Sequence, residues 1–187
     1  MILATTNPAK YAGMESLLES SGIVFTSPPV KLLELQSLDF KEVAEYKALS
    51  LFKAIGKPVI VDDAGLLLDA YPDFPGAMTK SILQSVGIEG IKKLLEGKTR
   101  SASLVCNITL CQSRESMIHF QGILRGSIGD TDVPQGRLPL NSVFIPEGET
   151  YPLEILKQQC ESYPDHRIIA FRQLSEYINN IRLSDAV

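Results

Sequence analysis

Two consecutive carboxylates, Asp62 and Asp63, end an apolar run and stand shortly before Gly65, where the chain is expected to turn. Residues 59–61 of that run are all β-branched and predict a short buried strand. A half-buried carboxylate costs free energy unless a cation or hydrogen-bond donors meet it. Mg²⁺ is the natural candidate, because it prefers oxygen ligands and commonly uses one or two carboxylates together with phosphate oxygens. The structural alternative is that both acids cap the following turn.

A second candidate lies near the N-terminus, in the turn Thr5-Thr6-Asn7-Pro8-Ala9-Lys10. Residues 1–6 predict a strand, and a helix is expected from Pro8 to about Ser20. Asn7 suits the N-cap and Pro8 the first helical position. A strand that runs into a helix leaves backbone N–H groups free for an anion, and Lys10 adds a positive charge there. Capping alone also explains Asn7 and Pro8, so a phosphate site is one of two interpretations.

A helix expected from Asp39 to about Ile55 carries two further candidates. Its apolar stripe is predicted to face a core and contains Ala44, Ala48, Leu51, Phe52 and Ile55. Lys47 lies on the flank of this stripe, where an ammonium group needs a partner or must extend to solvent. Glu42 lies off the stripe in the first turn, where the helix dipole favours an acid.

The remaining elements predict an α/β fold. Strands are expected at residues 23–26, 66–70, 102–111, 117–124 and 142–145, of which 102–111 and 117–124 form a hairpin. Helices are expected at residues 78–86, 88–96, 152–162 and 166–181. Residues 71–76 and 126–141 read as loops, and the longer one is of the kind that usually carries function. We expect one domain over residues 1–187, with a mixed, partly parallel central sheet flanked by helices and a cleft at strand ends.

Composition narrows the class of protein. The 187 residues are 44% hydrophobic and 21% charged, as in a globular domain, and the net charge of −4 argues against a nucleic-acid partner. No stretch approaches the ~20 apolar residues that span a bilayer, and the N-terminus lacks a basic leader, so we expect no membrane partner and a cytoplasmic location. Cys106, Cys111 and Cys160 show no metal-ligand spacing and are expected to be reduced, with the first two on opposite faces of one strand.

Several segments resemble the inosine triphosphate pyrophosphatases, the Ham1-like family, and occur in the family's order. Residues 5–10 resemble its T-x-N-x-x-K turn, 42–48 its E-N-A-x-x-K-A helix, 61–66 its D-D-S-G-L strand, 74–76 its F-P-G turn, 144–148 the end of its F-G-Y-D-P-I-F loop, and 166–167 its S-H-R helix start. The resemblance implies an elongated, two-lobed α/β fold with a central cleft, usually a homodimer. It also implies Mg²⁺-dependent hydrolysis of non-canonical purine nucleoside triphosphates, such as ITP, dITP and XTP, to the monophosphate and pyrophosphate.

The resemblance also implies roles for individual residues. The catalytic residues would be Asp63 as the base, Lys10 and Glu42. The metal ligands would be Glu42, Asp62 and Asp63. The substrate-binding residues would be Thr5, Thr6, Asn7, Lys10, Lys47, Ala64, Asn141, His166 and Arg167. Neighbouring side chains of a strand point to opposite sides, so only one acid of the pair can face a given cleft wall, and the resemblance selects Asp63.

The part of the family pattern that reads the base is altered in this chain. The family's G-F-G-Y-D corresponds to Arg137-Leu138-Pro139-Leu140-Asn141, so the aromatic platform is gone. Ala64 and Asp165 stand where the family has serine, and Glu161 and Ile169 stand where it has lysine. A His-Arg pair at a helix start is, apart from the resemblance, more typical of a solvated cap.

Three functions therefore remain open. The first is an active pyrophosphatase with altered or relaxed base specificity, in which Asn141 still offers hydrogen bonds and His166 or Tyr163 replaces the lost stacking. The second is a non-catalytic nucleotide- or polyphosphate-binding protein, because Glu161 and Asp165 would repel a triphosphate at short range. The third is a Mg²⁺-dependent phosphohydrolase of a smaller phosphorylated metabolite, which would not need the missing base contacts.

Overall fold

The computed structural model describes residues 2–4, 15–26, 35–130, 133–134 and 138–184. Its strands are β1 (Ile2–Ala4), β2 (Val24–Thr26), β3 (Val59–Leu68), β4 (Tyr71–Gly76), β5 (Ser101–Cys111), β6 (Met117–Ile128) and β7 (Phe144–Pro146). Its helices are α1 (Glu15–Ser20), α2 (Phe40–Ile55), α3 (Thr79–Leu94), α4 (Leu153–Gln159) and α5 (His166–Ser184), with a 3₁₀ turn η2 at Pro139–Ser142. None of the described helices is long and apolar enough to cross a membrane.

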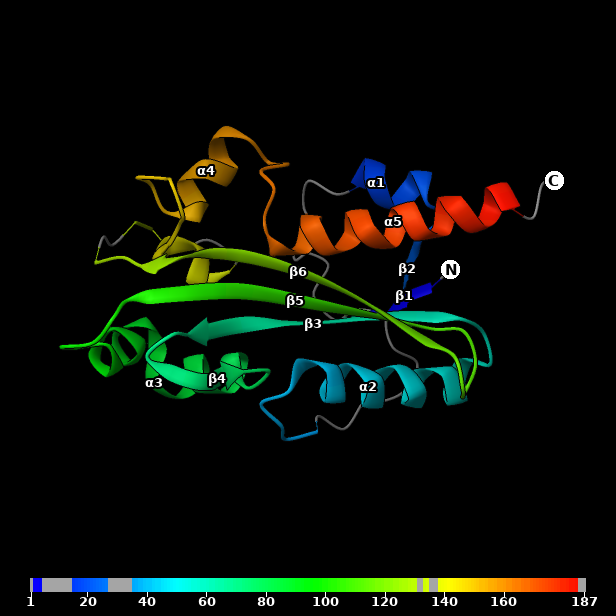
Figure 1. Cartoon of the computed structure of the whole chain (residues 1–187), viewed down its shortest axis with the longest axis horizontal. Coiled ribbons are helices and arrows are strands. Elements are labelled where there is room, and N and C mark those ends of the chain that lie inside the picture. Colours follow the sequence, from blue (N-terminus) through cyan, green and yellow to red (C-terminus); the bar gives the residue numbers. More distant parts are fainter. Residues whose placement is uncertain (1, 5–14, 27–34, 131–132, 135–137, 185–187) are drawn as a thin grey trace.

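A single mixed sheet forms the centre of the molecule. The strand order is β2-β1-β3-β5-β6-β7, and β4 pairs with β3 outside this path. β1 runs parallel to β2 and β3, whereas the β3–β5, β5–β6 and β6–β7 pairs are antiparallel. Helices α1 and α5 lie along one face of the elongated sheet, and α2 and α3 lie along the other (Figure 1). The predicted α/β class, the partly parallel sheet and the 102–124 hairpin are confirmed.

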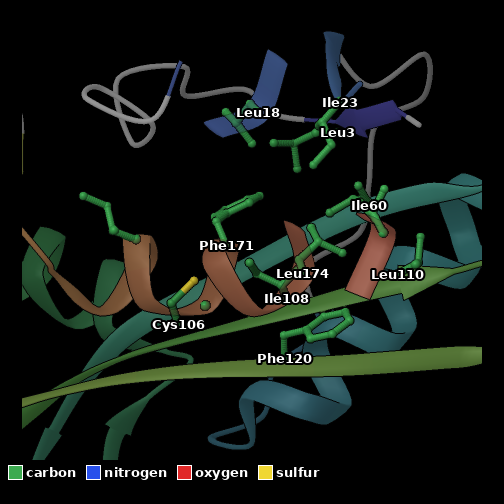
Figure 2. Packing of buried hydrophobic residues seen from close by; sticks show 13 residues of the cluster. Leu3, Leu18, Ile23, Ile60, Cys106, Ile108, Leu110, Phe120, Phe171 and Leu174 are labelled. Carbon is green, nitrogen blue, oxygen red and sulfur yellow. The ribbon is translucent and has the colours of Figure 1, made fainter. Parts of the chain in front are cut away.

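Apolar side chains fill both faces of the sheet. On the α5 face, Ile60 and Ile108 pack with α5 residues such as Phe171 and Leu174 (Figure 2). On the α2 face, alternate residues of the same strands pack under Ala44, Ala48 and Leu51 of α2. Cys106 belongs to the first cluster and Cys111 to the second, as the alternation of a strand predicts.

Helix α2 begins and ends where the sequence predicts. Asp39 is the N-cap, and its Oδ1 accepts hydrogen bonds from the N–H groups of Lys41 at 2.7 Å and Glu42 at 3.4 Å. Gly56 ends the helix in a left-handed conformation with φ of 69°, and its N–H donates to the Phe52 carbonyl. Because both ends of α2 are capped, its inward side chains keep fixed positions relative to β3.

Two local predictions were wrong, and both concern glycine and proline. The chain does not turn at Gly65, because β3 continues to Leu68. A Cβ on Gly65 would lie 2.5 Å from the Gly76 carbonyl oxygen and from Thr79 Oγ1, so this glycine allows close packing. Residues 71–76 form strand β4 against β3, and pairing between the strands overrides their turn-like composition. With no turn after the acid pair, the capping explanation for Asp62 and Asp63 also fails.

Candidate active site

The acid pair lies in the middle of β3. β1 pairs with β3 at Val59 and Ile60, and the β4 ladder starts at Leu66, so the acids lie between the two ladders. On its other side β3 pairs with β5, with Asp62 opposite Ile108 and Asp63 opposite Asn107. Counted as whole residues, both acids are only 8% exposed. A crevice where strands end is a common ligand site in α/β sheets.

Asp63 faces helix α2. Lys47 Nζ donates to Asp63 Oδ1 at 2.5 Å, and the two side chains are 18% and 11% exposed. Of the two options expected for Lys47, a partner or extension to solvent, this contact confirms the partner. A nearly buried lysine-carboxylate pair fixes both side chains, because either charge alone would be costly to bury.

Asp62 faces the opposite side of the sheet. Its neighbours in alternation, Ile60 and Ala64, pack into the cluster under α5. Its charge acts on the His166 imidazole at the start of that helix. The two acids therefore serve different faces of the sheet, as the alternation of strand residues requires.

His166 and Arg167 are buried at the N-terminus of α5, with exposed fractions of 2% and 8%, so they are not a solvated cap. β6 approaches this turn closely, since a Cβ on Gly122 would collide with the His166 carbonyl oxygen. Burial, assisted by the charge of Arg167, lowers the pKa of His166 well below its ordinary value, so the imidazole is neutral at pH 7. Among the described residues, His166 Nδ1 and Arg167 Nε have no hydrogen-bond partner.

Asp165 precedes this pair and is 2% exposed. Its Oδ1 accepts hydrogen bonds from the N–H groups of Arg167 at 2.9 Å and Ile168 at 3.0 Å, so the carboxylate caps α5. Its Oδ2 accepts from Lys157 Nζ at 2.7 Å. Burial raises the pKa of Asp165, but the positive charges around it, including Lys157, outweigh burial and leave the pKa below its ordinary value.

A cavity of about 850 Å³ opens on the α2 face. Its polar lining includes Asn107, His119 and Gln121 from the β5–β6 hairpin and Ser37, Asp39 and Lys41 at the start of α2. Asn107 is the ladder partner of Asp63, and its Oδ1 accepts a hydrogen bond from Gln121 Nε2 at 2.9 Å. The volume is in the range of small-molecule sites.

The hairpin residues of this cavity were not predicted from the sequence. In β5, Asn107 and Thr109 are two apart within an otherwise apolar run, so their side chains share one face. That spacing is the feature of the sequence that indicates a polar patch on one face of β5. Thr109 Oγ1 contacts His119 Nδ1 at 3.0 Å, and His119 Nε2 lies 3.0 Å from Glu45 of α2, so these polar groups form a connected network.

The remaining residues predicted for the site do not join the Lys47–Asp63 pair in the described part of the structure. Thr5, Thr6, Asn7 and Lys10 lie outside the described residues. Glu42 is exposed and its carboxylate accepts a hydrogen bond from Ser37 Oγ at 2.6 Å. Lys47 lies five positions further along α2, which places the two on different sides of the helix. Ala64 is partly buried in the α5-side cluster, and Asn141 is buried in η2.

The metal ligands remain a prediction. The described residues contain no group of three His, Cys, Asp or Glu side chains that could bind a metal ion. Mg²⁺ does not require such a cage, because it keeps several waters and is usually bound by one or two carboxylates and substrate phosphates. The nearly buried oxygen donors of Asp63 fit that role, whereas Asp62 faces the other side and Glu42 lies at the surface.

Comparison with known proteins gives full-length matches. Residues 1–177 match the model of the Ham1 family. The chain is 32% identical over 181 residues to a dITP/XTP pyrophosphatase of Methanopyrus kandleri, with 96% of each chain covered. It is 31% identical over 183 residues to an inosine triphosphate pyrophosphatase of Yarrowia lipolytica, with 95% of each chain covered.

Solved structures show the same architecture. A HAM1 protein from Coxiella burnetii matches with a TM-score of 0.82 at 25% identity, covering 96% of this chain and 98% of that chain. The Ham1 protein of Staphylococcus aureus matches with a TM-score of 0.79 at 22% identity and the same coverage, and thus shares the fold.

Proposed function

Because the chain belongs to the Ham1 family, we propose that it hydrolyses non-canonical purine nucleoside triphosphates, such as ITP, dITP and XTP, to the monophosphate and pyrophosphate. The observation that carries this proposal is the Lys47–Asp63 pair, which is nearly buried in the middle of the sheet. Asn107, the ladder partner of Asp63, lines a cavity of about 850 Å³. Catalytic carboxylates in enzymes are commonly held by a fixed partner in surroundings that contain little water.

In the proposed reaction Asp63 acts as a general base. It accepts a proton from a water molecule as the water oxygen bonds to the α-phosphorus, and the bond from that phosphorus to the bridging oxygen breaks. The electron pair leaves with pyrophosphate. Lys47 orients the Asp63 carboxylate, and the fixed geometry keeps the base within reach of the water.

Magnesium is part of this proposal. Asp63 would hold the ion, with Glu42 as the other expected ligand, and substrate phosphates would complete its shell. Asp62 faces the other side of the sheet and is not part of this proposed ion site. When bound, the ion would offset the negative charge that develops on the phosphate oxygens. Lys10 and the Thr5, Thr6 and Asn7 turn are expected to bind the triphosphate.

The base preference is proposed to be altered or relaxed. Asn141, the last residue of the changed base-reading segment, is 5% exposed and can both donate and accept a hydrogen bond. His166 is neutral and only 2% exposed, so it offers a base no ring face for stacking. Its Nδ1 has no hydrogen-bond partner within the described part of the chain, and we propose this nitrogen as its contact to the base. The homodimer is a further expectation, and light scattering should then give about twice the chain mass of 20.5 kDa.

One assay tests the reaction class. The purified protein is incubated with Mg²⁺ and ITP, XTP, dUTP, GTP or sugar phosphates, and the leaving group is identified. Pyrophosphate from a nucleotide supports the proposal, inorganic phosphate indicates the phosphohydrolase alternative, and binding without turnover indicates a non-catalytic protein. EDTA should abolish turnover and leave the unfolding temperature nearly unchanged, because the described residues contain no closed metal cage.

A variant tests the base. Asp63→Asn keeps the shape of the side chain but cannot take up a proton, so turnover should fall by about 10³-fold while nucleotide binding survives. Asp69→Asn, in the exposed turn after β3, is the matched control and should keep full activity. Near-normal turnover by Asp63→Asn would exclude Asp63 as the base.

A further inference from the structure

Arg100 binds the end of β6, at the end of the β5–β6 hairpin that lies opposite its turn. Its Nε donates a hydrogen bond to the Ile128 carbonyl at 2.6 Å, and its Nη2 donates to the Gly129 carbonyl at 3.3 Å. Nη2 also lies 2.8 Å from Asp130 Oδ1, but the Asp130 side chain is 84% exposed, so this ion pair adds little. The planar guanidinium therefore holds two successive backbone carbonyls in fixed directions.

The end of β6 is joined directly to the chain that follows η2. The Gly129 N–H donates to the Val143 carbonyl at 2.7 Å, and Ile128 pairs with Phe144 in the β6–β7 ladder. Gly129 is thus held on both sides, because its carbonyl accepts from Arg100 and its N–H donates to Val143. A shift of Gly129 would therefore move the end of η2.

Asn141 lies within η2, and backbone hydrogen bonds fix its position. Its N–H donates to the Leu138 carbonyl at 2.9 Å, and the Val143 N–H donates to the Leu140 carbonyl at 3.2 Å. Neither bond uses the side-chain amide of Asn141. That amide, which can both donate and accept, is left for a ligand.

The turn η2 and the segment that leads into α5 share one apolar cluster. Leu140 of η2 and Tyr163 both pack against the cluster that contains Phe144. His166 begins α5 shortly after Tyr163. The element that carries Asn141 and the approach to His166, the two proposed contacts to the base, therefore belong to the same packed unit.

We propose that Arg100 is a positioning residue for base recognition: by holding the Gly129 carbonyl it sets the position of η2 and of the Asn141 amide. Arg100 acts through the backbone and needs no contact with the nucleotide. This inference rests on the proposed function for the identity of the ligand. Because the ribose separates the base from the reacting α-phosphorus, a misplaced Asn141 weakens ground-state and transition-state binding alike. The KM for ITP should then rise while kcat stays unchanged.

The test compares two ligands by calorimetry in the presence of Mg²⁺. Asp63→Asn protein is used so that ITP is not consumed. Inorganic triphosphate carries the phosphates of ITP without its base. We expect Arg100→Met to weaken ITP binding by up to about tenfold, as for the loss of one hydrogen bond, and to leave triphosphate binding unchanged. A general loss of structure would weaken the binding of both ligands.

Further variants separate the geometry of Arg100 from its charge. Arg100→Lys keeps the positive charge but lacks the planar fork, so it should resemble Arg100→Met. Asp130→Asn removes only the exposed ion pair and should bind ITP normally. Arg114→Met, in the exposed turn at the other end of the same hairpin, is the matched control and should also bind ITP normally.

A double variant tests whether Arg100 acts through Asn141. Asn141→Leu removes the amide at similar size and should weaken ITP binding about as much as Arg100→Met. Both changes together should weaken it no further, because they remove the same contact to the base. In protein that retains Asp63, each single variant should show a higher KM for ITP with an unchanged kcat.

The outcomes separate this inference from the proposed reaction. Normal ITP binding or an unchanged KM in Arg100→Met, equal losses for ITP and triphosphate, additive losses in the double variant, or full recovery by Arg100→Lys would overturn the role of Arg100 even if ITP is hydrolysed. Absence of ITP binding by the unaltered protein would overturn both proposals. The expected binding pattern in a protein that hydrolyses no nucleoside triphosphate would support the role of Arg100 and overturn the proposed reaction.

Discussion

Replacing Gly122 by alanine is expected to push β6 and α5 apart at the start of the helix. The added Cβ would collide with the His166 carbonyl oxygen and lie 2.7 Å from the Ala170 amide nitrogen. Both atoms belong to the helix backbone, so rotation of a side chain cannot relieve the contact. Ordinary contacts of a Cβ begin at 3.4 Å, so the Ala170 nitrogen alone requires a separation of about 0.7 Å, and the closer His166 carbonyl oxygen requires more.

This displacement should reduce both stability and activity. Overpacking of this kind costs about 3 kcal/mol at the upper end of measured cases. For a chain of this size each kcal/mol corresponds to roughly 2–4 °C, so the unfolding temperature should fall by about 6–12 °C. Because His166 carries the colliding carbonyl, the substrate contacts of this turn would also move, and a shift near an ångström can lower kcat/KM about 100-fold.

The assay combines calorimetric unfolding with kcat/KM for ITP. Gly129→Ala is the matched control, because its Cβ would meet mainly the flexible Cδ1 of Ile145, which can rotate away. An unfolding temperature within about 2 °C of normal, together with full activity, would refute the tight contact between β6 and α5.

Two further predictions concern charged groups of the site. Lys47→Met removes the cation beside Asp63. The free energy of unfolding should fall by about 2–3 kcal/mol, slightly less than for a fully buried pair, and kcat should fall more than tenfold. Stability and turnover equal to those of Lys47→Arg would contradict this. Burial depresses the pKa of His166, so the unfolded chain binds the proton more readily than the folded one. The free energy of unfolding should therefore fall by up to about 1.4 kcal/mol per pH unit as the pH drops below 6.5. Denaturant titrations between pH 7 and 5 should show this fall in His119→Gln but a much smaller one in His166→Gln.

Local sequence patterns predicted the parts of the fold that depend on neighbouring residues. The cap at Asp39 and the stripe of α2 determine that helix, and the position of Lys47 on the flank of the stripe indicated either a partner or extension to solvent. The strand at residues 71–76 was missed because its pairing with β3 is a tertiary contact. Burial of His166 and Arg167 was missed for a similar reason, since it depends on β6 packing against the first turn of α5.

The candidate site was only partly accessible from the sequence. The sequence singled out Asp63 and Lys47 separately, and the structure joins them. The cavity residues Asn107 and Gln121 become neighbours only through the register of the β5–β6 hairpin. A pattern of residue types along the chain does not encode that register, which depends on both strands.

The ladder between β3 and β5 runs without interruption through ten residue pairs, from Val59 to Leu68. Sliding β3 by a single position would exchange the surroundings of its two acids and give Lys47 the wrong one. Loops at either end of β3 can therefore lengthen or shorten during evolution. Insertion of an odd number of residues within β3, however, would carry the proposed base to the opposite side of the protein.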